Sequence, residues 1–198
     1  DTATMNPAAV WESGTVGGRT RAVLEGLVGM DFETFQVHPE LAESWETSAD
    51  GLTVTFKLVR NATWHDGKPF TSADVKFTFD AIMKYGGPGK GMLEGYLNRV
   101  ETPDDYTVKF VFDKPYSVFL GIIADLYASE YVISPKHLYD GTDFFKNPYN
   151  DKPIGTGPFM FQEWVKGDHF TLVKNPNYRI KGLPYLDKII FKPIASAP

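Results

Sequence analysis

The sequence predicts an α+β or mixed α/β fold, and three observations support this prediction. Two segments, 41–59 and 99–112, each contain two runs of alternating apolar residues separated by a turn, as β-hairpins do. A third strand-rich region runs from Phe159 to Phe191. Helix-like stretches lie between these regions, and the clearest covers 71–83. Hairpins make the strand pairing largely antiparallel, and the helices that alternate with them complete the class.

The composition is that of a globular domain and excludes several classes of function. The chain has 198 residues, 42% of them hydrophobic and 23% charged, and it is long enough to bury a large core. Its 15% aromatic content suits either that core or a recognition surface. A net charge of −5 without a long Lys/Arg run argues against nucleic acid as a partner.

Cysteine is absent, which removes disulfides, thiolate nucleophiles and zinc–thiolate sites, and we expect no cofactor. No apolar run approaches the roughly 20 residues that span a bilayer, and the chain opens at Asp1 in polar sequence without a signal peptide. If the protein is exported, we expect this to be a mature or trimmed form.

The first sixty residues predict a loop, a short helix and a hairpin. Residues 1–18 are loop-like, and Thr20 is placed to cap a helix whose apolar positions run from Ala22 to Leu27. Strands at 41–46 and 52–59 flank the turn 48–51. In the second strand Val54, Phe56 and Leu58 alternate onto one face, and Phe56 is expected in the core.

The middle of the chain predicts a capped helix and a second hairpin. Thr71 and Asp74 form a capping pair for a helix that reaches about Met83, with Phe79 on its core face. The glycine-rich 86–91 looks superficially like a P-loop, but it lacks the required glycine at its start and the Ser or Thr at its end, so we expect a surface loop. Strands at 99–102 and 106–112, with Phe110 in the core, enclose the turn 103–105.

Helical segments are then expected at 116–125 and 135–139, and a polar and aromatic loop at 142–152. The bend from Pro153 to Phe159 follows. Its glycines can enter positive-φ regions and Pro158 fixes its own φ, which predicts a rigid bend feeding a strand at Phe159. A phosphate cradle is disfavoured, because the third glycine of a dinucleotide fingerprint is missing. Strands follow from 159 to 165, from 170 to 174 and around 186–191, with Phe161 in the core.

Catalytic and metal motifs are weak in this sequence. No histidine stands three or four residues from another, and neither His-Glu-x-x-His nor Gly-x-Ser-x-Gly occurs. His65-Asp66 is the best catalytic pair on paper and defines one alternative function, a hydrolase. The pair lies in a turn before a helix cap, so a structural hydrogen-bonding role is favoured.

Two separated groups of motifs resemble the family 5 extracellular solute-binding proteins, the oligopeptide- and dipeptide-binding type that serves ABC importers. The C-terminal group is a Gly-Thr-Gly-Pro-aromatic bend, a Gly-Asp hairpin, an Asn-Pro-x-Tyr turn and a Leu-Asp-Lys-Ile strand. The N-terminal group comprises the segments 41–46, 50–53, 56–58, 64–71 and 74–75. The resemblance implies a periplasmic-binding-protein type II-like fold, of which this chain holds only the N-terminal portion. It implies a first part of lobe I at 1–40, a small N-terminal domain at 41–151 and an incomplete return into lobe I at 152–198.

The resemblance also implies where a solute binds. Aligning Glu25-Gly26-Leu27 with the family's Glu-Gly-Leu places the ligand-pairing loop on Trp11, Glu12, Ser13 and Gly14. A second ligand-facing edge falls on Tyr127, Ala128 and Ser129, and Tyr96 is a weaker candidate. Main-chain pairing with an extended ligand gives affinity, while side-chain pockets set preference.

By the same resemblance the protein is a bacterial solute-binding component that captures peptides or a related small solute and delivers it to ABC permease subunits. It is expected to be a monomer without enzymatic activity, periplasmic or extracellular, with a lipid anchor possible in the precursor. An oligosaccharide ligand is the alternative within the family, because Trp11 also suits stacking on a sugar. Family members are much longer, so we expect a fragment that alone binds solute weakly or not at all.

Overall fold

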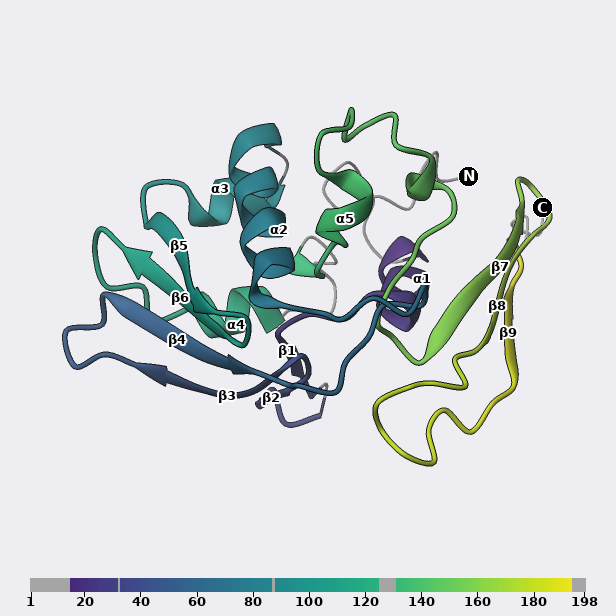
Figure 1. The fold of residues 1–198 in the computed structure, drawn as a ribbon, viewed down its shortest axis with the longest axis horizontal. Coiled ribbons are helices and arrows are strands. Elements are labelled where there is room, and N and C mark those ends of the chain that lie inside the picture. The colour runs from purple at the N-terminus through teal and green to yellow at the C-terminus, as the bar shows by residue number, and fades with distance from the viewer. Residues whose placement is uncertain (1–14, 32, 87, 125–130, 194–198) are drawn as a thin grey trace.

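The computed structural model describes residues 15–31, 33–86, 88–124 and 131–193 of the 198-residue chain. In that part of the chain every strand pair is antiparallel, and the strands form three sheets, ordered β1-β2, β3-β4-β6-β5 and β7-β8-β9. The helices α2 and α3 lie beside the four-stranded sheet, while α1 lies near the three-stranded sheet (Figure 1). The α+β prediction is confirmed.

The first predicted hairpin is confirmed as β3 (Ala42–Thr47) and β4 (Thr53–Leu58). Its turn is closed by Asp50, whose Oδ1 accepts hydrogen bonds from Ser48 Oγ at 2.6 Å and Leu52 N at 3.0 Å. Gly51 takes the left-handed φ of 69° that the turn requires. In β4 the predicted face of Val54, Phe56 and Leu58 is buried, so the alternation of apolar residues correctly predicted which side of this strand faces the core.

The helix α2 (Ser72–Tyr85) begins with the predicted capping box between Thr71 and Asp74, in which Thr71 N donates to Asp74 Oδ2 at 3.0 Å. It covers the sheet formed by β3, β4, β5 (Leu97–Asp104) and β6 (Thr107–Phe112). The Phe79 ring meets Phe110 edge to face at 4.7 Å, and Phe56 meets Phe110 at 5.5 Å. These three rings are essentially buried, so truncating any of them to alanine should cost roughly 3–5 kcal/mol.

The remaining helical segments are short: α4 (Phe119–Ala124), α5 (Lys136–Tyr139) and a 3₁₀ turn at Pro148–Asn150. The third sheet consists of β7 (Phe159–Val165), β8 (His169–Lys174) and β9 (Lys188–Phe191). Phe170 and Leu172 are its buried anchors, and Phe161 packs against the same core at partial burial. The three predicted C-terminal strands are therefore confirmed.

Two local predictions were wrong, and one pair of strands was missed. The helix α1 spans Thr15–Val23, so it starts earlier than expected, and Thr20 is a buried residue inside it instead of its cap. Part of the glycine-rich segment forms α3 (Pro88–Leu93), anchored by the fully buried Leu93. The two three-residue strands β1 (Val28–Met30) and β2 (Val37–Pro39) were not anticipated, because so short a run carries no periodicity.

Candidate functional site

The Gly155–Gly157 bend is built against the end of α1. Gly157 N donates to Val23 O at 2.9 Å, and a Cβ on Gly157 would lie 2.6 Å from that oxygen. A Cβ on Gly155 would lie only 1.8 Å from the same atom. Neither glycine has a positive φ, so the reason for glycine here is the close backbone approach and not the positive φ that the sequence suggested. The predicted bend, and the strand that follows it from Phe159, are confirmed.

His65 fixes the bend from the opposite side. Its backbone N donates to Gly155 O at 2.8 Å, its Nδ1 accepts from Gly155 N at 3.2 Å, and its Nε2 lies 3.0 Å from Gly157 O. A neutral ring with its proton on Nε2 satisfies both side-chain contacts. Burial lowers the pKa of His65, which favours the same neutral form.

These contacts weaken the hydrolase alternative. Both ring nitrogens of His65 are engaged by backbone groups, while Asp66 Oδ2 pairs with His137 Nε2 at 2.7 Å. The two side chains thus face different partners, and His65 has no free nitrogen to act as a general base. The favoured structural role of His65 agrees with this geometry.

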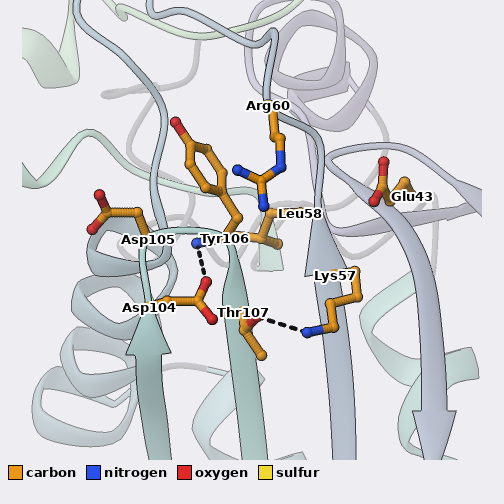
Figure 2. Close-up of a pocket in the computed structure, with 8 residues that line it drawn as sticks. All are labelled: Glu43, Lys57, Leu58, Arg60, Asp104, Asp105, Tyr106 and Thr107. Carbon is orange, nitrogen blue, oxygen red and sulfur yellow. Dashed lines mark hydrogen bonds between the residues drawn. The ribbon is translucent and has the colours of Figure 1, made fainter.

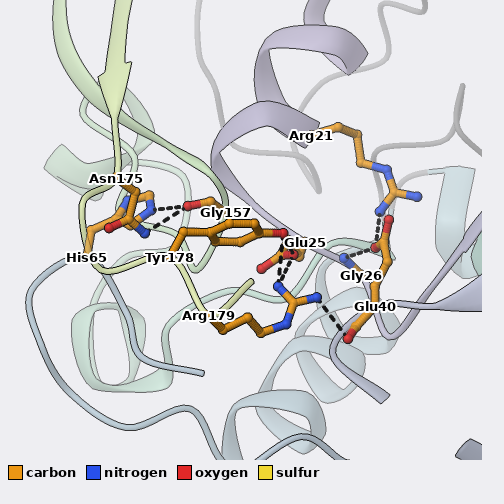
Figure 3. Close-up of polar contacts among 9 residues, drawn as sticks. All are labelled: Arg21, Glu25, Gly26, Glu40, His65, Gly157, Asn175, Tyr178 and Arg179. Atoms are coloured by element: carbon orange, nitrogen blue, oxygen red, sulfur yellow. Dashed lines mark hydrogen bonds and ion pairs between the residues drawn. The ribbon is translucent and has the colours of Figure 1, made fainter. Parts of the chain in front are cut away.

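Beside the glycine bend, a buried network joins the N-terminal and C-terminal parts of the described chain (Figure 3). The Glu25 carboxylate accepts hydrogen bonds from Tyr178 Oη at 2.9 Å and from Arg179 Nη1. Arg179 Nη2 also donates to the carbonyl oxygen of Glu40 at 2.9 Å. Residues separated by up to 154 positions therefore meet around one ion pair.

Glu40 extends this network to α1. Its Oε2 accepts from Gly26 N at 2.9 Å and from Arg21 Nη1 at 3.2 Å. Asn175 Nδ2 donates to Gly157 O at 3.0 Å, which links the Asn-Pro-x-Tyr turn to the bend. The sequence had assigned Asn175 and Tyr178 only to a turn and had given Arg179 no role, because their partners lie far away along the chain.

Burial sets the electrostatics of the pair. The side chains of Glu25 and Arg179 are only 6% and 7% exposed. Burial raises the pKa of Glu25, while the Arg179 charge acts in the opposite direction. Removing one member of such a pair leaves an uncompensated buried charge, so the pair fixes the junction even if its net contribution to stability is small.

Of the predicted ligand residues, Tyr96 alone lies within the described part of the chain. Its ring is half-buried and stacks on Tyr116 with centroids 4.0 Å apart, and Lys114 Nζ lies 4.1 Å from its centroid. These contacts give the ring a packing role at the start of β5. The others lie outside the described residues: Trp11, Glu12, Ser13, Gly14, Tyr127, Ala128 and Ser129.

The structure does describe the supports on either side of those segments. The helix α1 starts at Thr15, directly after the first predicted ligand loop, and its C-terminal end rests on the glycine bend. After the second predicted segment the described chain resumes at Tyr131, and Ile133 N donates to Glu25 O at 2.9 Å. Each predicted ligand segment therefore adjoins a hydrogen-bonded part of the chain: the first adjoins α1, whose Val23 bonds to the bend, and the second adjoins the segment in which Ile133 bonds to Glu25.

The return segment is also fastened to α2 and α3. Tyr131 Oη donates to Gly89 O at 3.0 Å, and Ser134 N donates to Thr78 Oγ1 at 2.9 Å. Lys136 N donates to Asp74 Oδ1 at 3.0 Å, so the capping residue of α2 also holds the start of α5. Burial raises the pKa of Asp74, and its hydrogen bonds oppose that shift.

A separate hollow of about 290 Å³ lies at one end of the four-stranded sheet (Figure 2). Within it Lys57 Nζ donates to Thr107 Oγ1 at 3.0 Å, and the Arg60 guanidinium lies 4.6 Å from the centroid of the Tyr106 ring. The lining mixes both charges and includes none of the predicted ligand residues: Glu43, Lys57, Leu58, Arg60, Asp104, Asp105, Tyr106 and Thr107.

Among residues 15–31, 33–86, 88–124 and 131–193, no three His, Asp or Glu side chains gather in a way that could hold a metal ion. Within them, too, no helix has the length and apolar character needed to cross a membrane.

The model described as "Bacterial extracellular solute-binding proteins, family 5 Middle" matches residues 36–198, which is most of the chain. The chain belongs to family 5 of the extracellular solute-binding proteins. A Brucella ovis member, provisionally named as an ABC transporter peptide-binding protein, is 38% identical over 194 residues, covering 94% of this chain and 34% of its own length.

Two solved structures share the fold of this chain. AgaA of A. tumefaciens R10, solved with agropinic acid, superposes with a TM-score of 0.86 at 32% identity, covering 97% of this chain and 38% of that one. The oligopeptide-binding protein AppA of Bacillus subtilis, solved with a nonapeptide, gives 0.85 at 28% identity, with 98% and 38% covered. The fold is thus that of periplasmic-binding-protein type II proteins, and the chain spans about a third of the length of the relatives it matches.

Proposed function

We propose that this chain is the N-terminal part of the solute-binding component of an ABC-type importer, which captures a peptide or a related small solute and delivers it to permease subunits. The family match over residues 36–198 is the observation that carries this proposal. Proteins of this family and the relatives compared above are transport-binding proteins. We therefore propose that the chain has no enzymatic activity, and the engaged ring of His65 supports this.

The proposed solute contacts are the two segments named from the sequence, Trp11 to Gly14 and Tyr127 to Ser129. Support comes from the rigid elements beside them, because precise binding loops need a fixed scaffold. The glycine bend fixes the end of α1, and Ile133 joins the return segment to Glu25. Tyr96 is a weaker candidate, since its ring already stacks on Tyr116.

A peptide is the favoured solute class. The Brucella ovis relative is named for peptide binding, and AppA was solved with a nonapeptide. Main-chain pairing between an extended peptide and the 11–14 loop would supply affinity with little demand on side chains. An oligosaccharide is the alternative within the family, and AgaA shows by its agropinic acid that a small solute of another kind can occupy such a protein.

The remaining proposals concern organisation and location. We assign residues 1–40 and 152–198 to one lobe and 41–151 to a small domain, a division supported by the position of the four-stranded sheet within 42–112. The complete protein is proposed to be a monomer in the periplasm or outside the cell, with a lipid anchor in its precursor and no nucleic-acid partner. Lobe closure on the solute would be a hinge motion.

The test uses the complete protein that contains this sequence, purified without denaturation. Native mass spectrometry should reveal a co-purified solute, and calorimetry should then give a 1:1 stoichiometry. Trp11→Ala should weaken solute binding at least 10-fold, whereas Trp164→Ala, on the outer strand β7, should leave it unchanged. The proposal fails if the protein binds neither peptides nor oligosaccharides but turns over a substrate in a His65-dependent way.

A further inference from the structure

The turn that carries His65 and Asp66 connects the two parts of the chain that we assign to the small domain and to lobe I. His65 belongs to the small domain, and its ring contacts reach the glycine bend of lobe I, 90 and 92 positions further along the chain. Asp66 faces another partner, because its Oδ2 lies 2.7 Å from Nε2 of His137, on α5 of the same small domain. Two adjacent side chains thus attach one turn to both domains.

Protonation of His65 would reverse the role of one ring nitrogen. In the neutral ring Nε2–H donates to Gly157 O, while Nδ1 accepts from Gly155 N at 3.2 Å. A protonated imidazole carries a hydrogen on both nitrogens. Its Nδ1–H would point at the N–H of Gly155, and two donors cannot form a hydrogen bond. The ring and Gly155 must therefore move apart when His65 takes up a proton.

The bend is packed too closely on α1 to absorb that movement. A Cβ on Gly155 would lie 1.8 Å from Val23 O, and Gly157 N donates to the same oxygen at 2.9 Å. His65 Nε2 and Asn175 Nδ2 both contact Gly157 O at 3.0 Å (Figure 3). Closely packed elements respond to a small shift by repacking as units. A displaced bend would therefore carry the end of α1 with it.

We propose that protonation of His65 is a pH switch that loosens the small domain from lobe I and weakens solute binding. The solute contacts need a fixed scaffold, and α1 and the bend are part of that scaffold. This inference rests on the proposed function, because it adds a pH dependence to the solute affinity of that same protein. The contact between Asp66 and His137 should survive in acid, since protonation of His137 turns it into an ion pair. Acid would thus loosen the turn from lobe I alone.

The surroundings of His65 favour its neutral form near neutral pH. Burial lowers the pKa of His65, while its bond to Gly157 O and the charge of Asp66 act in the opposite direction. The side chain of Glu25, beyond the bend, is paired with Arg179. In the described part of the chain, the titratable and charged groups on the elements around the turn and the bend are Glu25, Asp66, Lys68, Asp74, His137, Tyr178 and Arg179. The switch should therefore operate below the ordinary histidine pKa of 6.5.

The experiment uses the complete protein and the solute identified by native mass spectrometry. Calorimetry should show the wild-type solute Kd rising roughly 3- to 10-fold between about pH 7.5 and about pH 5, the effect of one lost hydrogen bond. Coupling between two binding events is reciprocal, so bound solute should lower the pKa of His65. An NMR titration of histidine-labelled protein, with and without solute, measures that change.

Two substitutions separate the ring nitrogens. His65→Asn keeps an acceptor near the position of Nδ1 and does not titrate, so its Kd should stay within threefold of the wild-type value at about pH 7.5 throughout the range. His65→Gln keeps a donor near the position of Nε2 but offers Gly155 N no acceptor, so it should bind weakly at every pH. The matched control is His169→Asn on β8, which removes a ring that contacts Asp168 at 2.8 Å and Glu163 at 3.3 Å. It should keep the wild-type pH profile.

The outcomes separate the switch from the proposed function. If the wild type binds solute with a Kd that does not change with pH, or if His65→Asn keeps the wild-type pH dependence, the inference is wrong and the proposed function stands. If the protein binds no solute, the proposed function is wrong, and hydrogen exchange decides whether the switch exists. The protection factor of the Gly155 amide should then fall in acid for the wild type and not for His65→Asn, and equal protection factors would refute the switch.

Discussion

Replacing Gly157 with alanine tests the close packing of the bend on α1. The new Cβ would lie 2.6 Å from Val23 O and 2.8 Å from Ala22 O, both backbone atoms that cannot rotate away. Overpacking of this kind costs about 1–3 kcal/mol. The shift would also weaken the hydrogen bond from Gly157 N to Val23 O, worth about 0.5–1.5 kcal/mol. We expect a total loss of about 2–4 kcal/mol, or a Tm lower by roughly 5–15 °C in a chain of this size.

Thermal unfolding followed by circular dichroism measures this loss. The matched control is Gly91→Ala in α3, where a Cβ meets nothing within 4 Å and the helix should gain up to about 1 kcal/mol. In the complete protein, calorimetry should show Gly157→Ala retaining the wild-type ranking of solutes. A Gly157→Ala variant with unchanged stability and altered solute preference would refute the interpretation of the bend as a structural junction.

Two further outcomes concern the junction, and a third concerns the isolated chain. Arg179→Met should lower the free energy of unfolding by about 3–5 kcal/mol, measured in denaturant, because it leaves the Glu25 charge buried without a partner. Adding Glu25→Met should recover most of that loss. A cost below about 1 kcal/mol for Arg179→Met alone would contradict a buried pair. Because burial lowers the pKa of His65 below its ordinary 6.5, the unfolded chain binds a proton first, so stability should be lost as the pH falls from 6.5 through the folded pKa. His65→Gln should remove that part of the pH dependence, and an NMR titration midpoint of His65 at or above 6.5 would contradict it. Finally, calorimetry on the isolated 198-residue chain should detect no tight peptide or sugar binding, and stoichiometric tight binding would show that it is not a partial site.

The sequence predicted correctly those elements whose stabilising contacts join residues close together in the chain. The β3–β4 hairpin follows from strict alternation and from a turn in which Asp50 and Gly51 act on their immediate neighbours. The start of α2 follows from Thr71 and Asp74, three positions apart. In each case both partners fall within one short window of sequence.

The wrong predictions, for α1 and α3, concern elements that are stabilised by packing against distant parts of the chain. Thr20 looks like a cap, yet it is completely buried within α1, whose end is held by a bend more than 130 residues away. The segment of α3 is rich in glycine and poor in intrinsic helix propensity, and the buried Leu93 compensates for this. No window-based rule contains either contact.

The candidate site was predictable only by family resemblance. The junction of Glu25, Tyr178 and Arg179 depends on contacts that span more than 150 residues, which periodicity does not report. The clue in the sequence was Glu25 itself, a charged residue in the apolar run from Val23 to Leu27. Such a residue is seldom buried without a partner, so its presence could have prompted a search for a distant arginine.

The Glu25–Arg179 pair also has a consequence for the time course of folding. Closing a loop of 154 residues costs about 4–5 kcal/mol of chain entropy, which short-range contacts cannot offset in advance. At a synthesis rate of about 5–20 residues per second, Arg179 is synthesised roughly 8–30 s after Glu25. The segment around α1 and Glu25 should therefore stay unfolded or loosely collapsed until the β7-β8-β9 sheet forms. Amide protection should then appear in that segment and in that sheet at the same time.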